Sequence, residues 1–218
     1  MSEPCLFSTS RLYFRKLTHE DTESYYKWMG DRKVTQYLEN RFFPHSREDL
    51  KYYIDGKNSD PNCIFLGMFH PCIIKHTPPN PHNFPPQEYN THIGNIKLDY
   101  IDWIHRRGEI GIMIGEKEYW GQGYGEEAIR GLCEFAFNEL NLFRITAGCY
   151  EANKASLGAF QKAGFFVEGV YRKHIWCNGE WNDEVLMGLL KYEYQPRSLR
   201  VLPQSFSEDL LAEEASLD

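Results

Sequence analysis

Apolar and polar positions alternate in several short runs of this chain, and that period of two predicts β-strands. RLYFRKL at 11–17 is the first such run, and CIFLGMF at 63–69 is the continuous apolar run of a buried strand. Further strands are predicted at 92–102, 109–116, 143–150, 170–176 and 180–190. Asn178-Gly179 separates the last two runs and predicts a tight β-hairpin.

Other segments carry the spacing of helices. Apolar residues recur every three or four positions between 125 and 140, and ANKASLGAFQKAGF at 152–165 predicts a helix that ends at Gly164. Thr18 with Asp21, and Ser46 with Asp49, have the spacing of capping boxes that open two earlier helices. The second of these helices is expected to stop at Gly56.

The predicted order is βααβββαβαββ, and helices interleaved among strands favour an α/β class with a mixed sheet covered by helices. Residues 1–194 are expected to form a single domain. Residues 70–91 carry six prolines and almost no periodicity, which predicts a long surface loop between two strands. Residues 195–218, rich in Ser, Glu and Asp, are expected to form a loosely ordered tail.

Charge and composition narrow the classes of function. The net charge is −7 and no long run of Lys and Arg occurs, so neither nucleic acid nor an anionic membrane is an expected partner. No apolar stretch is long enough to span a bilayer, and the N-terminus lacks the pattern of a signal peptide. The six cysteines form no CxxC pair, which favours a reduced, cytoplasmic protein.

Glycines at 121, 123 and 125 stand between a predicted strand and a predicted helix. Bare main-chain amides and the positive end of a helix dipole would meet at this turn, which favours binding of an anion such as a phosphate. A dinucleotide fingerprint would need another glycine where Glu126 stands, and the Lys of a Walker loop is absent. A plain tight turn before a helix is the competing interpretation.

The wider arrangement, strand–YWGQGYGEEA–helix–strand–YEANKAS–helix ending in AGF, resembles the GNAT N-acetyltransferases, in particular their RimJ/RimL-like branch. The resemblance runs from about Arg11 to Tyr194 and is sharpest at 109–128 and 149–165. It implies a central mixed, mostly antiparallel β-sheet with helices on both faces. It also implies acetyl-CoA as cosubstrate, transfer of the acetyl group to a primary amine, and a homodimer as a common assembly.

The same resemblance implies roles for individual positions. The cofactor-binding positions that it implies are Ile112, Met113 and Ile114 for the pantetheine arm, Gln122, Gly123, Tyr124, Gly125 and Glu126 for the pyrophosphate, and Asn153 with Ser156 for the pantetheine again. Many members carry a Tyr acid where this chain has Phe160, and a phenyl ring has no proton to give. The general acid is then Ser156, water, or no group at all, since a thiolate is a tolerable leaving group.

Direct attack on a thioester requires a neutral amine, whereas an ordinary primary amine is mostly protonated at pH 7. Glu109 is the leading candidate for the general base, because it begins the strand that would carry the thioester. A solvated charge at a strand end is the competing interpretation of Glu109, and Glu151 is a second candidate. His174 and Asp183 are expected to face each other across the terminal hairpin, where they would shape an acceptor pocket or form a structural pair.

Several questions stay open at this level. The acceptor is a protein N-terminus or a small amine such as a polyamine, an aminoglycoside or an amino-sugar nucleotide, and the 70–91 loop is the expected place of acceptor specificity. Because of Phe160, an inactive acyl-CoA-binding sensor is the alternative function. Cys63, His70, Cys72 and His76, with His82 nearby, match no standard zinc motif, so no metal is expected.

Overall fold

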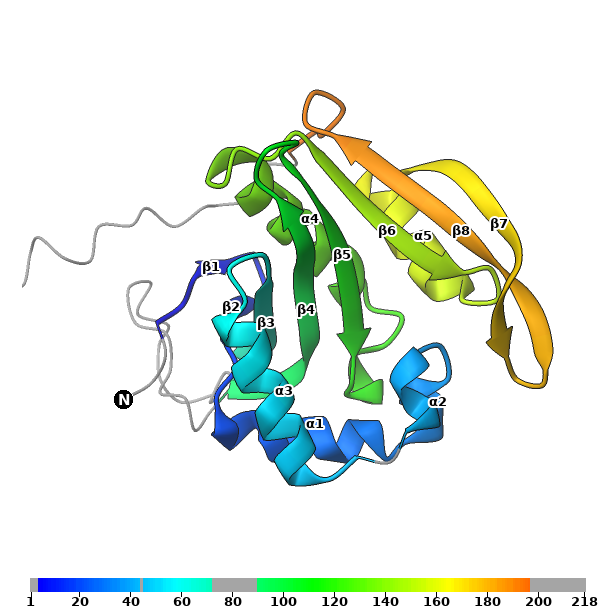
Figure 1. The fold of residues 1–218 in the computed structure, drawn as a ribbon. Helices are drawn as coiled ribbons and strands as arrows, with labels where there is room; N and C mark the ends of the chain where they lie inside the picture. Colours follow the sequence, from blue (N-terminus) through cyan, green and yellow to red (C-terminus); the bar gives the residue numbers. More distant parts are fainter. Residues whose placement is uncertain (1–3, 44, 72–89, 197–218) are drawn as a thin grey trace, which may run out of the picture.

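The computed structural model describes residues 4–43, 45–71 and 90–196, and its strands form one eight-stranded sheet (Figure 1). The sheet has the order β1-β2-β3-β4-β5-β6-β8-β7. The strands are β1 Phe7–Ser8, β2 Tyr13–Lys16, β3 Ile64–Pro71, β4 Asn90–Asp102, β5 Arg107–Ile114, β6 Arg144–Tyr150, β7 Phe166–Cys177 and β8 Glu180–Leu190. In this sheet β5 and β6 run parallel and the other neighbours run antiparallel. The expectation of a mixed, mostly antiparallel sheet is therefore confirmed.

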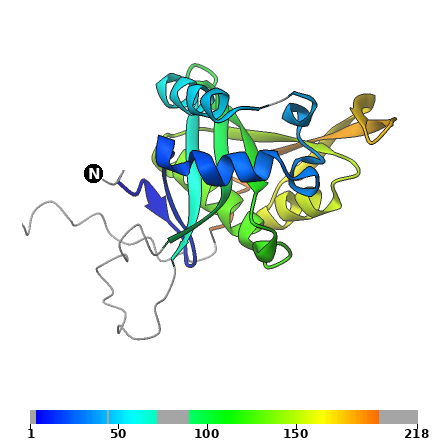
Figure 2. The same ribbon diagram turned by 90° about the horizontal axis from the view of Figure 1, so that it is seen from below.

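Helices cover both faces of the sheet, as Figure 2 shows from below. On one side lie α1 (Thr22–Met29) and α3 (Arg47–Ser59), and on the other lie α4 (Tyr124–Asn138) and α5 (Lys154–Ala163). The short helix α2 (Arg32–Thr35) lies beyond the lower ends of β5 and β6 in Figure 1. Single 3₁₀ turns occur at His19–Asp21, Glu39–Phe42 and Lys117–Tyr119.

The two larger apolar cores follow from this layering. The larger lies under α4 and α5, where Leu132, Cys133 and Phe137 pack with Ile96 and other strand residues. The smaller lies under α1 and α3. Its members are Leu17, Tyr25, Trp28, Met29, Leu50, Ile54, Cys63 and Phe65. Burying a large apolar side chain contributes about 1.5–3 kcal/mol, so these faces hold the helices against the sheet.

The predicted helix stop at Gly56 is wrong, because α3 continues to Ser59. A glycine inside a helix costs about 1 kcal/mol. Tertiary contacts of the last turn offset that cost: Lys57 binds the Asp99 carboxylate, and Asn58 donates a hydrogen bond to the main-chain oxygen of Leu17. No sequence pattern predicted the two-residue strand β1 or the four-residue helix α2.

Residues 70–71 and 90–91 of the predicted loop are strand residues of β3 and β4. The remainder of that loop, 72–89, and most of the predicted tail, 197–218, lie outside the described residues. The predicted hairpin turn is confirmed, since Asn178 (φ 54°) and Gly179 (φ 85°) both adopt the left-handed conformation that this turn requires.

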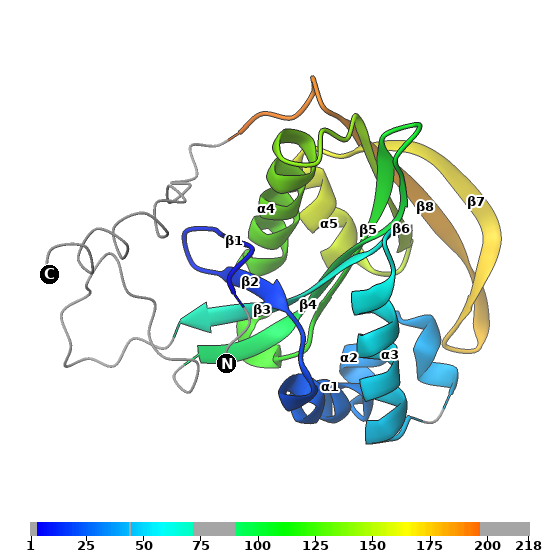
Figure 3. The same ribbon diagram turned by 60° about the vertical axis from the view of Figure 1, so that its left-hand side comes forward.

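The parallel pairing of β5 with β6 is short, and the candidate site lies where this pairing ends. Pairing covers Arg107–Glu109 of β5 and Arg144–Thr146 of β6 and then ends. Beyond it the two strands separate, and Figure 3 shows the β7–β8 hairpin curving away on the β6 side. The β6-facing edge of Ile110–Ile114 therefore has no neighbouring strand in the described part of the chain.

Candidate functional site

The glycine turn follows β5 and leads into α4. Gly121 (φ 72°) and Gly123 (φ 82°) are left-handed, a conformation that costs other residues roughly 1–2 kcal/mol. Gly123 is the N-cap of α4, so the amides of Tyr124 and Gly125 belong to the first turn and lack intrahelical acceptors. These amides and the helix dipole make the turn a suitable anion site.

Arg11, in the N-terminal segment before β2, contacts and stabilises this turn. Its Nε lies 2.6 Å from Oε2 of Glu127, its Nη1 donates to the Gln122 carbonyl at 3.0 Å, and its guanidinium covers the Tyr124 ring at 4.1 Å. Burial alone would raise the pKa of Glu127, yet hydrogen bonds from Thr9 and Arg11 lower it. No sequence signal indicated this role, because 116 residues separate Arg11 from Glu127.

The main chain of β5 supplies the positions predicted for the pantetheine arm. Met113 packs against the core under α1 and α3, whereas Ile112 and Ile114 pack against the core under α4. The indole of Trp120 donates a hydrogen bond of 2.9 Å to the Ile114 carbonyl. That bond ties the end of β5 to the start of the glycine turn.

Two predicted residues lie together at the N-terminus of α5. Asn153 is the N-cap, and its side-chain oxygen accepts a hydrogen bond from the Ser156 amide at 3.1 Å. The Ser156 hydroxyl lies 3.5 Å from the Cys149 sulfur of β6. Phe160 is buried in the core, with its ring centroid 5.0 Å from that of Phe165. At the position where many family members carry a Tyr acid, this chain therefore has a core side chain that cannot donate a proton.

Glu109 lies at the end of the β5–β6 pairing, opposite Thr146 on β6 and Asp99 on β4. Among the described residues, its accessible carboxylate forms neither an ion pair nor a hydrogen bond. Loss of hydration first, and then the negative charges of Glu184, Asp99 and Glu39, raise the pKa of Glu109, against an opposing effect of Lys97. An unpaired carboxylate with a raised pKa is suited to accept a proton.

Asp99 differs from its cross-strand neighbour Glu109 because it has two cationic partners. Lys57 and Lys97 each donate to its carboxylate at 2.7 Å. Burial opposes ionisation of Asp99, but these lysines lower its pKa to about 2. This side chain is therefore a fixed anion with its charge largely balanced.

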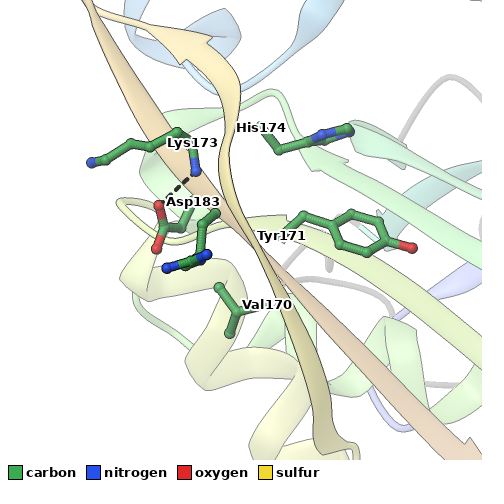
Figure 4. Close-up of a pocket in the computed structure, with 6 residues that line it drawn as sticks. Val170, Tyr171, Lys173, His174 and Asp183 are labelled. Carbon is green, nitrogen blue, oxygen red and sulfur yellow. Dashed lines mark hydrogen bonds between the residues drawn. The ribbon is translucent and has the colours of Figure 1, made fainter.

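The expectation that His174 and Asp183 face each other is wrong. The register pairs Tyr171 with Glu184 and Ile175 with Asn182, so a bulge of three β7 residues lies opposite Asp183. In Figure 4, Tyr171 and His174 extend to one side of β7, whereas Asp183 lies on the other and accepts a hydrogen bond of 2.9 Å from the Lys173 amide. A bulge redirects side chains in this way, and sequence alternation alone does not reveal it.

The second candidate base, Glu151, forms an ion pair with Lys154 in the first turn of α5. Of the metal candidates, Cys72, His76 and His82 lie outside the described residues, and the part of the chain that is described holds no cluster of three or more metal-binding side chains. Within the same part, no helix has the length and apolar character needed to cross a membrane.

Comparison with known proteins identifies the family of this chain. The family model described as "Acetyltransferase (GNAT) domain" matches residues 11–166. The "Uncharacterized N-acetyltransferase YnaD" of Bacillus subtilis is 28% identical over 190 residues, which cover 86% of this chain and 98% of that protein. The "Putative ribosomal N-acetyltransferase YdaF" of the same species is 36% identical over 102 residues, 47% of this chain and 55% of that protein.

A solved structure gives a matching fold. The spermidine N-acetyltransferase of Vibrio cholerae in complex with CoA and spermine superposes with a TM-score of 0.69 at 22% identity, over 85% of this chain and 98% of that chain. The family model matches more than half of the sequence, which shows the family and its enzyme class. The chain belongs to the GNAT acetyltransferase family, and it is an acetyl-CoA-dependent N-acetyltransferase.

Proposed function

We propose that the turn at 121–126 holds the pyrophosphate of acetyl-CoA and that Glu109 removes the proton from the acceptor amine. The observation that carries this proposal is the free edge of β5. Five residues, Ile110–Ile114, separate Glu109 from the end of the strand, after which the glycine turn follows. At about 3.3 Å per residue this edge is roughly 17 Å long, which suits an extended arm hydrogen-bonded to the strand. The same edge would place the thioester near Glu109.

The two proposed proton-transfer groups then flank the thioester. Glu109 shares a face of the sheet with Thr146, and alternation along β6 puts Cys149, the neighbour of Ser156, on the opposite face. The amine loses its proton to Glu109 and attacks the carbonyl carbon, so that a C–N bond forms as the C–S bond breaks. The CoA thiolate leaves without an acid, or it takes a proton from the hydroxyl group of Ser156.

Carboxylates near Glu109 favour a cationic acceptor. Glu39 and Glu184 both act on the pKa of Glu109, and negative charge attracts an ammonium group before its proton is removed. A polyamine is therefore the first acceptor to test, in keeping with the spermidine acetyltransferase of similar fold. A ribosomal-protein N-terminus is the second, in keeping with the relative named for that activity.

The experiment is an acceptor screen monitored by thiol release from acetyl-CoA, with spermidine, spermine and N-terminal peptides of ribosomal proteins. With the accepted amine, Glu109→Gln is expected to lower turnover at neutral pH about 100-fold. Calorimetric affinity for acetyl-CoA should stay unchanged, and Glu151→Gln is the matched control with full turnover. Undiminished turnover in Glu109→Gln would remove this residue from the mechanism.

We also infer that the enzyme works in the reducing cytoplasm. The described cysteines Cys5, Cys63, Cys133, Cys149 and Cys177 are free thiols, and four of them are buried. Burial raises the pKa of Cys63, to about 12, and also the pKa of Cys133. Such thiols stay protonated and behave as small apolar side chains.

A further inference from the structure

A second carboxylate, Glu184 of β8, lies over the neighbouring strand β6. A Cβ added to Gly148 would come within 2.4 Å of the Glu184 Oε1 atom, so the carboxylate occupies space that only a glycine leaves open. The Glu184 side chain is 22% exposed, and no Lys or Arg among the described residues pairs with it. Its nearest basic side chain is His174, whose Nε2 lies 3.6 Å from Oε2 of Glu184.

The bulge in β7 aims His174 at Glu184. Since Arg172, Lys173 and His174 together oppose one residue of β8, strict alternation is broken at this point. Lys173 adopts a left-handed φ of 51°, and its amide donates to Asp183, which holds the bulge in place (Figure 4). A strained backbone that redirects a histidine toward a half-buried carboxylate is typical of the neighbourhood of an active site.

Sheet register places this pair beside Glu109. Glu109 lies opposite Thr146 on β6, and Gly148, which lies under the Glu184 carboxylate, is two residues further along the same face. Glu184 is the first of the charged neighbours that raise the pKa of Glu109. The others facing Glu109 are Asp99 and Glu39, which act in the same direction, and Lys97, which opposes them. Asp99 is balanced by two lysines, whereas Glu184 is not.

We propose that Glu184, held in place by Gly148 and His174, is a positioning residue that acts on acetyl transfer through Glu109. This inference rests on the proposed role of Glu109 as the base. A negative charge kept beside Glu109 makes that carboxylate take up a proton more readily, and so makes it a better acceptor for the proton of the amine. The His174 ring, with Nε2 3.6 Å from Oε2 of Glu184, limits the movement of this carboxylate.

The test is a ¹³C NMR titration of protein labelled at the glutamate side-chain carboxyl carbons, with Glu109 assigned by the loss of its signal in Glu109→Gln. In Glu184→Gln the titration midpoint of Glu109 is expected to fall by about half a pH unit, the effect of removing one partly screened like charge. Gly148→Ala, in which the new methyl group displaces the Glu184 carboxylate, should shift it in the same direction.

Glu168→Gln is the matched control. The Glu168 carboxylate also lies over a glycine of the sheet, 2.4 Å from the position of a Cβ on Gly188, but it pairs with Arg144 and is not among the largest charges acting on Glu109. A Glu109 midpoint that is unmoved in Glu184→Gln, or that moves equally in Glu168→Gln, would overturn the inference. This result is independent of turnover, so it is distinct from failure of Glu109 as the base.

Enzyme kinetics test whether the effect of Glu184 on the titration of Glu109 also affects acetyl transfer. With an accepted amine, the acidic limb of the kcat/KM profile should move to lower pH in Glu184→Gln, by the same amount as the NMR midpoint. A shift in the NMR midpoint without a shift in this limb would show that Glu184 has no part in the transfer.

Discussion

Arg11 and Glu127 are joined by an ion pair of 2.6 Å, and through it the segment before β2 holds the first turn of α4. The same guanidinium reaches the Gln122 carbonyl and the Tyr124 ring. One side chain therefore contacts Gln122 and Tyr124 of the proposed pyrophosphate turn and Glu127 directly after it. A positive charge at that place also complements an anion bound by the amides.

Replacing this brace should weaken acetyl-CoA binding while preserving the fold. For Arg11→Met we expect about a tenfold loss of affinity for CoA. This loss corresponds to the free energy of one charge-assisted hydrogen bond. Isothermal titration with CoA measures it. Arg47→Met is the control, because Arg47 also pairs with a glutamate and covers a tyrosine ring, but does so on α3. Equal affinities for Arg11→Met and wild type would contradict the proposed brace.

Alanine substitutions at Gly123, which is left-handed, and at Gly158, which lies inside a helix, are expected to change stability in opposite directions. Gly123→Ala should lower stability by about 1–2 kcal/mol, because an L-residue is strained at φ 82°, and should also weaken CoA binding. Gly158→Ala lies inside α5 with no atom within 4 Å of the new methyl group, so it should raise stability by up to about 1 kcal/mol. Urea unfolding of both variants checks the two signs.

Buried His92 predicts loss of stability in mild acid. Its Nε2 lies 2.8 Å from the Asn95 side-chain oxygen, and its ring packs against Trp28 and Phe69. Burial lowers the pKa of His92 to about 4, from an ordinary value of 6.5. Between these two values the unfolded chain binds the proton and the folded chain does not, so stability falls as pH falls through this window.

From pH 7 to pH 5 the loss assigned to His92 should be about 2 kcal/mol, measured by urea unfolding at each pH. The variant His92→Gln should lack this component, whatever its own stability at pH 7. The contribution of Asp99, whose pKa is about 2, is lost only at lower pH and does not overlap this window. A wild-type protein equally stable at both values would contradict the prediction.

The buried ion pair of Arg15 and Asp21 predicts a large loss of stability from the conservative substitution Asp21→Asn. Two guanidinium nitrogens donate to the Asp21 carboxylate at 2.8 and 2.9 Å, and both side chains are buried. Asp21→Asn leaves the Arg15 charge buried without its partner and should cost about 3–5 kcal/mol. Glu23→Gln removes an exposed partner of Arg47 and should leave Tm unchanged, which thermal unfolding of both variants will test.

Local sequence determined the elements that depend on a few neighbouring residues. Ser46 and Asp49 form the predicted capping box, and Asn178-Gly179 forms the predicted turn. Gly164 ends α5 in a left-handed conformation, as expected of a helix C-cap. The glycine turn at 121–125 is of the same kind, because left-handed glycines and a helix start require no distant contact. These features were predictable since their energetics are contained within one turn of chain.

Tertiary structure alone decided how distant segments meet. Arg11 reaches Glu127, α3 continues past Gly56, and Glu184 lies over Gly148, because sheet register and layer packing bring these residues together. The same holds for the error at His174 and Asp183, where a bulge changed which side chains share a face. A sequence states which residue types are present and with what period. The chemical environment of Glu109 arises only when strands far apart along the chain are aligned, since charge and burial depend on distance in space.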